Sequence, residues 1–338
     1  MKKKTALKDI ALHVGVSTAL VSYVMNNQEK EKRVGQEVAK KIRAAAEELN
    51  YRPNQIAKSL KTKKTHTIGL IVADINYRFT TGVTSSIEAE AKKHNYTVII
   101  GSSNEDAKKF TELVDVMVNR QIDGLILVPV AHSDEQIETL KKHDIPFVLI
   151  DRYFPNIEAN QITIDNFKAA YQLVSHVIKH GYKNIGCINY RTSLSHLLER
   201  DKGYDQALKD YHIPAAKGLK KKIRETHRQE DVEKAVYELV NQLPACDAIF
   251  FASDTLALAG LSTIVRLKKK IPEDVAIISF DESEAFGLFY CPITHGRQPL
   301  EQIGKLAVNT LLNSIAQPKG YKQLYLESEL IIGKSCAE

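Results

Sequence analysis

The N-terminal residues place apolar and polar positions in a pattern that predicts two short helices joined by a tight turn. Apolar residues at positions 7, 10, 11 and 14 fall on one helical face. Gly15 follows, where the helix must end and the backbone must take a positive φ. Ser17 is placed to cap a second helix, whose outward face carries Thr18, Ala19, Ser22 and Tyr23. The pattern is typical of a helix-turn-helix that reads DNA, although a helical corner inside a core has the same pattern.

Beyond residue 65 the pattern changes to short buried strands that alternate with helices. Apolar runs bounded by turn residues lie at 67–73, 96–101, 123–128, 146–150, 184–189, 247–252 and 275–280. Amphipathic segments such as 84–94 and 107–120 lie between them. This alternation predicts parallel sheets with covered faces. The roughly 275 residues involved exceed one compact α/β unit, which favours two subdomains with a ligand cleft at the carboxyl ends of the strands.

The basic side chains are distributed unevenly along the chain. The 338 residues contain 47 Lys and Arg against 41 Asp and Glu, a formal net charge of +6. Residues 1–64 hold fifteen of the basic and six of the acidic side chains, which leaves 32 basic and 35 acidic for the remainder. All of the basic excess therefore lies in the N-terminal part, where it suits contacts with DNA phosphates. A merely soluble lysine-rich terminus is the alternative.

Composition narrows the class of protein further. The four cysteines, at 187, 246, 291 and 336, form no CxxC pair and have no histidine at metal-ligand spacing, so we expect buried thiols and no metal site. The start MKKKT is not followed by an apolar signal-peptide core, and no run approaches the ~20 apolar residues of a membrane span. No nucleotide-binding, nucleophile-elbow or zinc-protease motif is present. We therefore expect a cytoplasmic protein with no catalytic residue, no cofactor and no membrane partner.

Three segments together carry a resemblance to a known family. KDIALHVGVSTALVSYVMNN at 8–27, ELNYRPNQIAKSLK at 48–61 and HTIGLIVADI at 66–75 resemble the lactose-repressor/galactose-repressor (LacI/GalR) family of bacterial transcription regulators. The resemblance covers essentially the whole chain, and its most specific elements are the helix-turn-helix and the YRPN–A–SL hinge. It implies an all-α headpiece with a hinge helix, then a two-subdomain α/β effector domain of the type I periplasmic-binding-protein class. It also implies a homodimer on a palindromic double-stranded DNA operator.

The resemblance and the apolar pattern give domain boundaries. The headpiece would span 1–52, the hinge helix and linker 53–65, and the effector-binding and dimerisation domain 66–338. Within the last, we place one subdomain at 66–163 and 294–322, and the other at 164–292 and 323–338.

The DNA-contacting residues follow from the same resemblance. On the second helix they are Ser17, Thr18, Ala19, Ser22, Tyr23 and Asn26. Tyr23 departs from the family, which usually has an arginine there, able to bond a guanine edge with two hydrogen bonds. We therefore expect the outer base pairs of each operator half-site to differ from those that the family usually binds. Asn26 has an alternative role as a helix C-cap.

The hinge contributes three more DNA-contacting residues. A helix as short as QIAKSLK is unstable alone, and in the family it folds only when two copies meet over the minor groove. Leu60 matches the residue that wedges into a central base step. Ala57 matches the small residue that lets the two hinges approach, and Lys61 matches a neighbouring contact. A hydrophobic contact between domains is the alternative for Leu60.

The effector-binding positions that match the family are Phe79, Asp151, Arg200 and Asp281, while His196 and Leu194 fall where the family varies with the ligand. Phe79 would stack on a sugar ring, the two aspartates would accept from hydroxyls, and the Arg200 fork would hold hydroxyls or a carboxylate. His196 is a candidate specificity residue. The alternatives are core packing for Phe79, an interdomain ion pair for Arg200 and a helix cap for Asp281.

We predict a ligand-responsive repressor of carbohydrate-utilisation genes, whose affinity for DNA changes when a sugar or sugar derivative occupies the cleft. The basic run KKKIRETHR at 220–228 would suit an acidic or phosphorylated sugar, and a solvated charge run is the other interpretation. Two other functions are considered. One is a non-regulatory cytosolic sugar-binding protein. The other is a sugar-active enzyme that would use the strand-end carboxylates Asp151, Asp254 and Asp281.

Overall fold

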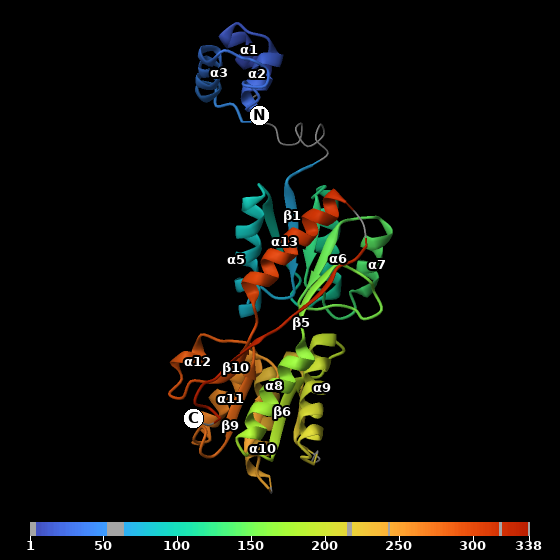
Figure 1. Ribbon diagram of the computed structural model, residues 1–338, viewed down its shortest axis with the longest axis vertical. Helices are drawn as coiled ribbons and strands as arrows, with labels where there is room; N and C mark the ends of the chain where they lie inside the picture. The colour runs from blue at the N-terminus through green and yellow to red at the C-terminus, as the bar shows by residue number, and fades with distance from the viewer. Residues whose placement is uncertain (1–4, 53–63, 215–217, 243, 318–319, 337–338) are drawn as a thin grey trace. The chain divides into compact units, whose positions relative to one another are not determined.

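The computed structural model describes residues 5–52, 64–214, 218–242, 244–317 and 320–336. The chain forms two compact units that meet between Thr65 and His66 (Figure 1). Within the described residues, no single helix is long and apolar enough to cross a membrane, and the one pair that passes on length and composition bends by 111°.

The N-terminal unit contains three helices around a small apolar core. They are α1 (Leu7–Val14), α2 (Thr18–Met25) and α3 (Gln36–Glu48). Gly15 ends α1 with a φ of 73°, and its N–H bonds to the carbonyl of Ala11. The Ser17 hydroxyl accepts from the Leu20 N–H at 3.2 Å and so caps α2. The predicted helix–turn–helix is therefore confirmed in its glycine turn and in its cap. Ile10, Val21, Val24 and Ile42 form the fully buried centre of this unit.

The second unit is built on two six-stranded sheets. The first sheet has the order β11-β5-β4-β3-β1-β2 and is parallel throughout. Its strands are β1 (Thr67–Val72), β2 (Thr97–Ser102), β3 (Gly124–Leu127), β4 (Phe147–Ile150), β5 (Gln161–Ile164) and β11 (Gln323–Leu326). The helices beside it are α5 (Arg78–Lys93), α6 (Ala107–Asn119), α7 (Asp134–Lys142) and α13 (Leu300–Ala316). We call this half of the unit the first lobe.

The second sheet has the order β12-β10-β9-β8-β6-β7, in which only β12 runs antiparallel to its neighbour. Its strands are β6 (Ile185–Tyr190), β7 (Lys220–Ile223), β8 (Ala248–Phe251), β9 (Ala276–Phe280), β10 (Thr294–Arg297) and β12 (Glu329–Ile331). Its helices are α8 (Asn166–Lys179), α9 (Ser195–Asp210), α10 (Arg228–Asn241), α11 (Asp254–Arg266) and the short α12 (Ala285–Leu288). This half is the second lobe.

The seven apolar runs that predicted strands all form strands, and the fold class is confirmed. The assignment of the C-terminal segments is partly wrong. Residues 294–322 were expected in the first subdomain, yet β10 pairs with β9 in the second lobe. Residues 323–338 were expected in the second, yet β11 pairs with β5 in the first lobe. The chain thus crosses between the lobes after β10 and again between β11 and β12 (Figure 1). β11 pairs with a strand far back in the chain, Gln323 beside Gln161, whereas β10 pairs with β9, which precedes it closely in the chain, Thr294 beside Ile278. Local periodicity does not encode which sheet each strand joins.

Candidate functional site

The outward face of α2 carries most of the residues expected to contact DNA. Ser17, Thr18 and Ala19 are exposed, and Tyr23 is half-buried. The Nζ atom of Lys32 lies 6.0 Å from the centroid of the Tyr23 ring. The beginning of this helix is therefore open to a partner, with a cation beside its one aromatic side chain.

Asn26 and Ser22 are held to one another. Asn26 is the C-cap of α2, and its Nδ2 donates to the carbonyl of Ser22 at 2.8 Å and approaches the Ser22 hydroxyl at 3.4 Å. The capping role foreseen as the alternative for Asn26 is thus present. The hinge positions Ala57, Leu60 and Lys61 lie outside the described residues.

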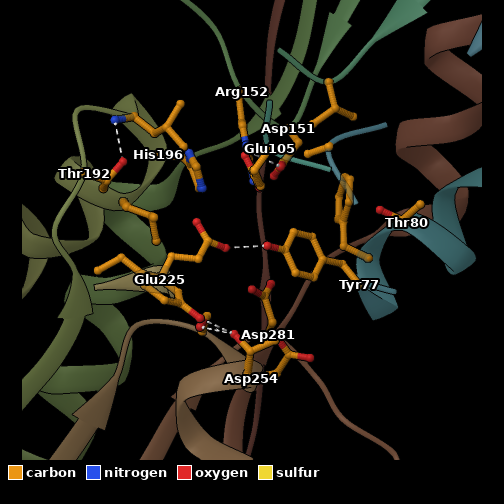
Figure 2. A pocket seen from close by; sticks show the side chains of 18 of the residues that line it. Tyr77, Thr80, Glu105, Asp151, Arg152, Thr192, His196, Glu225, Asp254 and Asp281 are labelled. Atoms are coloured by element: carbon orange, nitrogen blue, oxygen red, sulfur yellow. Dashed lines mark hydrogen bonds and ion pairs between the residues drawn. The ribbon is translucent and has the colours of Figure 1, made fainter. Parts of the chain in front are cut away.

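A cavity of about 600 Å³ lies between the two lobes, at the carboxyl ends of their strands (Figure 2). Carboxylates that follow individual strands line it: Glu105 after β2, Asp151 after β4, Glu225 after β7, Asp254 after β8 and Asp281 after β9. Parallel strands bring their carboxyl ends to one edge of a sheet, and the two sheets turn these edges toward each other. The cavity is therefore rich in acceptors from both lobes.

All five residues expected to contact an effector line this one cavity: Phe79, Asp151, His196, Arg200 and Asp281. Phe79 also packs partly against the core of the first lobe, so its two interpretations are compatible. Arg200 pairs with Asp281 inside the second lobe, which excludes the interdomain ion pair considered for it. The structure gives Asp281 no capping role, since the helix that follows begins after Glu284.

Arg200 is a buried arginine in the wall of the cavity, and its guanidinium holds three neighbouring groups in place. Its side chain is 3% exposed. One nitrogen, Nη1, donates to the carbonyl of Ala252 at 2.7 Å and to Asp281 Oδ2 at 3.3 Å. Nε donates to Asn166 Oδ1 at 2.9 Å, and the guanidinium lies 3.5 Å from the centroid of the Phe280 ring. Arg200 thereby fixes Asp281, whose own φ is 67°.

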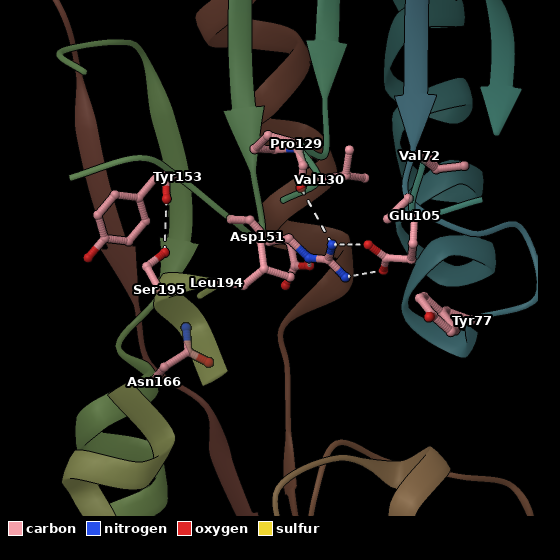
Figure 3. A network of polar contacts seen from close by, with 12 residues as sticks. Val72, Tyr77, Glu105, Pro129, Val130, Asp151, Tyr153, Asn166, Leu194 and Ser195 are labelled. Carbon is pink, nitrogen blue, oxygen red and sulfur yellow. Dashed lines mark hydrogen bonds and ion pairs between the residues drawn. The ribbon is translucent and has the colours of Figure 1, made fainter. Parts of the chain in front are cut away.

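Glu105 and Arg152 form a second buried pair that sequence reasoning missed. The Arg152 fork donates to both Glu105 oxygens, at 2.8 and 2.7 Å (Figure 3). The Nε atom of Arg152 lies 3.3 Å from Asp151 Oδ2. Burial raises the pKa of Asp151 to about 6, against the opposing effect of the neighbouring arginines. The available signal was the position of Glu105 shortly after a strand, as for the three aspartates.

Polar contacts also bridge the two lobes around the cavity. The Tyr77 hydroxyl, before α5, donates to Glu225 Oε1 at 2.6 Å. Arg78 contacts Glu282 at 2.7 Å and the exposed Glu284 at 3.2 Å. These contacts join groups at opposite walls of the cleft, so the cavity depends on how the lobes are positioned.

Most of the basic run at 220–228 is neutralised on the second lobe. Acids of neighbouring helices hold four of its five lysine and arginine side chains, in the pairs Lys220–Asp205, Lys221–Glu238, Lys222–Asp201 and Arg224–Asp231. The fifth, Arg228, bonds to Tyr190, which lines the cavity. Of these nine residues, Glu225 lines the cavity. The charge-run interpretation fits the four paired side chains, whereas Arg228 lies beside the cavity.

Metal and thiol chemistry find no support in the described part of the chain. No group of three or more His, Cys, Asp or Glu side chains is arranged there to hold a metal ion. The four cysteines are free and buried, as expected. Burial raises the pKa of Cys187 and Cys246, which keeps both thiols protonated.

A helical DNA-reading unit joined to two lobes around a polar cleft defines the class of ligand-responsive DNA-binding regulators. Comparison with known proteins agrees. A model of the bacterial regulatory proteins of the lacI family matches residues 6–54, and a periplasmic binding protein-like domain matches residues 174–336. The ribose operon repressor of Haemophilus influenzae is 31% identical over 97% of this chain and 98% of its own. The repressor CytR of Escherichia coli K12 is 32% identical over 98% and 96%.

The chain belongs to the LacI family, and it is a transcription regulator that binds DNA. A solved structure titled as the Lac repressor dimer bound to operator and the anti-inducer ONPF has the same fold, with a TM-score of 0.86 at 21% identity over 99% of this chain and all of the other. The relatives are regulators and not enzymes, and the alternative of a non-regulatory sugar-binding protein is not favoured.

Proposed function

We propose that this protein is a cytoplasmic repressor that binds a palindromic operator as a homodimer and changes its DNA affinity when a sugar or related polyol occupies the cleft. The headpiece would be residues 1–52, the hinge 53–65 and the effector-binding domain 66–338. The cavity of about 600 Å³, lined by strand-end carboxylates, carries this proposal because it is joined to a helix-turn-helix in the same chain.

The effector would act by shifting the relative position of the lobes. A ligand that contacts both Asp151 of the first lobe and Asp281 of the second fits one arrangement of the two lobes better than any other. It therefore stabilises that arrangement, by the difference between its affinities for the alternative arrangements. The Tyr77–Glu225 and Arg78–Glu282 contacts would change with it. A ligand that favours the folded hinges is a corepressor, and one that disfavours them is an inducer.

Selection of the purified protein against random duplex DNA tests the proposal. At near-physiological salt we expect a palindrome with a flexible central step, because a dimer reads two half-sites and the hinges deform the centre. The selection is run without ligand and with pools of sugars. If no sequence is enriched under any of these conditions, the protein is not a sequence reader.

The edge of the first sheet supports the homodimer. β2 is the last strand of that sheet, and Ile99 and Ile100 on it are 40% and 44% exposed. An exposed apolar edge strand is prone to pair with another chain. We propose that a second copy of the protein covers it.

Replacing Ile100 by lysine is then expected to raise the dimer dissociation constant about 30-fold or more, because a charge is placed in an apolar contact. Sedimentation over a range of concentrations measures this effect. The same substitution at Ile332, which is 64% exposed in the second lobe, is the matched control and should leave the dimer intact. A dimer that tolerates lysine at both positions would place the interface elsewhere.

Replacing Tyr23 by arginine is expected to change the preferred bases at the outer positions of each operator half-site toward guanine. An arginine fork bonds O6 and N7 of guanine together, which is worth about 1–3 kcal/mol of discrimination, whereas a tyrosine hydroxyl makes a single bond. Selection with the wild type and the variant measures the change. The Tyr23→Phe variant, which keeps the ring and loses the hydroxyl, shows how much that bond contributes. Identical preferences in all three proteins would mean that position 23 does not read sequence.

A further inference from the structure

The charged groups that line the cavity are unequal in number. Six carboxylates and four guanidinium groups line it, and no lysine among the described residues does. Three of the four guanidinium groups are already committed to acids of the cavity. Arg152 is held by Glu105, Arg78 by Glu282, and Arg200 by Asp281. The fourth, on Arg191, is exposed at the rim, where water and salt screen it. Arg228, which is not itself a lining residue, bonds to the lining residue Tyr190. The cavity therefore has few uncommitted cationic donors to offer a ligand.

Asp254 is a carboxylate of the cavity that forms no ion pair among the described residues. Each oxygen of the neighbouring Asp281 already accepts one hydrogen bond, from Arg200 and from the Gln298 amide, and can accept a second. No side-chain donor contacts Asp254 among the described residues. Burial and the charge of Asp281 raise the pKa of Asp254 to about 7, while a hydrogen bond from the backbone N–H of Thr255 and the charges of Arg200 and Arg78 oppose that rise. A carboxylate in this position is stabilised when a ligand supplies the missing donor.

Two buried polar side chains give an independent indication of the same chemistry. Gln298 is 8% exposed, and its Nε2 donates to Asp281 Oδ1 at 2.5 Å, while its Oε1 has no donor in the described part of the chain. His196 is 5% exposed, and its Nδ1 has no partner among the described residues. Burial and the neighbouring Arg152 and Arg200 lower the pKa of His196, so its ring is neutral. Figure 2 shows this ring directed into the cavity. Buried polar atoms of this kind are normally paired, so their partners are expected on the ligand.

We propose that the effector carries no anionic group and presents at least two hydrogen-bond donors, hydroxyl or ammonium, to an acceptor face formed by Asp254, Asp281 and Gln298. The cleft rejects phosphorylated and carboxylated sugars, because an anion beside this face meets uncompensated negative charge in a partly dry site. This inference rests on the proposed function and narrows the class of ligand that the cleft takes.

A panel of matched ligands tests the inference on the full-length protein. D-ribose, D-glucose, D-galactose and nucleosides are each compared with their phosphate esters, and the hexoses also with their amino sugars and uronic acids. Thermal unfolding finds the members that bind, and calorimetry measures their affinities. The tightest binder is expected to be neutral or amino-bearing, and to bind about 100-fold more tightly than its phosphate or carboxylate counterpart.

A phosphorylated or carboxylated member that binds as tightly as its parent overturns the inference, and so does a panel in which no neutral or amino member binds. Sequence-selective DNA binding is measured separately. If it persists in either case, the failure concerns the ligand class and leaves the proposed function standing.

The Asp254→Asn variant tests the acceptor face directly. It is expected to lose about 10-fold to 100-fold in affinity for the neutral or amino ligand, the size of a charge-assisted hydrogen bond. Asp205→Asn is the matched control, because Asp205 lies on the same lobe, outside the cavity, and pairs with Lys220. Equal losses in both variants would overturn the assignment.

The pH dependence of binding gives a second readout. Donors on the ligand favour the ionised carboxylate, so binding lowers the pKa of Asp254, and affinity is lost as pH falls through about 7. Asp281, Arg200 and Arg78 face Asp254 from the neighbouring elements, and Asp151, with a pKa raised to about 6, adds a weaker loss at lower pH. The wild type should therefore bind more tightly at pH 8 than at about pH 6, and the Asp254→Asn variant should show a smaller change. A wild-type affinity that does not vary with pH contradicts this role of Asp254.

Discussion

Replacing Arg200 by methionine is expected to lower the free energy of unfolding of residues 66–338 by about 3–5 kcal/mol and to abolish ligand binding. The guanidinium supplies donors to Asp281, to the carbonyl of Ala252 and to Asn166, at 3.3, 2.7 and 2.9 Å. Methionine fills a similar volume but leaves these buried acceptors without partners, and Asp281 loses the cation that compensates its charge. A fall in melting temperature of about 10 °C corresponds to this loss.

Chemical and thermal unfolding measure this loss of stability. Two further variants serve as comparisons. Arg266→Met removes an exposed pair with Glu233 on the same lobe and should change the free energy of unfolding by less than about 1 kcal/mol. Arg200→Lys keeps the charge but cannot make the three bonds in the same directions, so an intermediate loss is expected. An Arg200→Met protein as stable as the Arg266→Met control would show that the Arg200 guanidinium contributes nothing to the stability of the lobe.

Replacing Leu60 by alanine is expected to reduce affinity for the selected operator about 100-fold, while binding to unrelated DNA is unchanged. The expectation comes from the sequence, because residue 60 lies outside the described part of the chain. A leucine wedged into a base step allows the kinked duplex to contact more of the protein, and alanine is too short to do so. Non-specific affinity depends on phosphate contacts, which the substitution leaves in place.

Electrophoretic or fluorescence titrations at one fixed salt concentration measure both affinities. Leu288→Ala is the matched control, since Leu288 is 87% exposed in the second lobe and far along the chain from the headpiece. If Leu60→Ala lowers the melting temperature of the protein without changing operator affinity, the residue joins two domains and does not enter DNA.

Several elements follow from the sequence because their cause is local. Gly15 ends α1 and Ser17 caps α2, since a positive φ and an N-cap hydroxyl depend on neighbouring residues alone. Six of the seven apolar runs form strands buried on both faces, which requires continuous apolar residues, and the seventh forms the half-exposed edge strand β2. Asp151 and Asp281 line one cavity because strand-end positions in parallel sheets converge at one edge. The other residues expected to bind the effector reach the cavity from α5 and α9, namely Phe79, His196 and Arg200. The family resemblance selected which of them to name.

Other features were decided by contacts between distant parts of the chain. β7 has the sequence KKKI, which looks like a solvated run, yet it forms an edge strand because helices of the second lobe supply acids for its lysines. The Arg152–Glu105 pair joins positions 47 apart, and the exchange of β10 and β11 between lobes depends on pairing with β9 and β5.

The sequence by itself determined the class of protein, the helix-turn-helix and most of the strands, because these depend on residue types within a few positions of each other. Only the tertiary structure decided the charge balance of the cleft. Whether an arginine can hold a ligand depends on which acid already holds the arginine. Glu105 and Asp281 reach their partners only when each lobe is folded, and Glu282 reaches Arg78 only when the two lobes are joined. Most cations of the basic run that favoured an acidic ligand are neutralised by acids of their own lobe, and six carboxylates line the cavity.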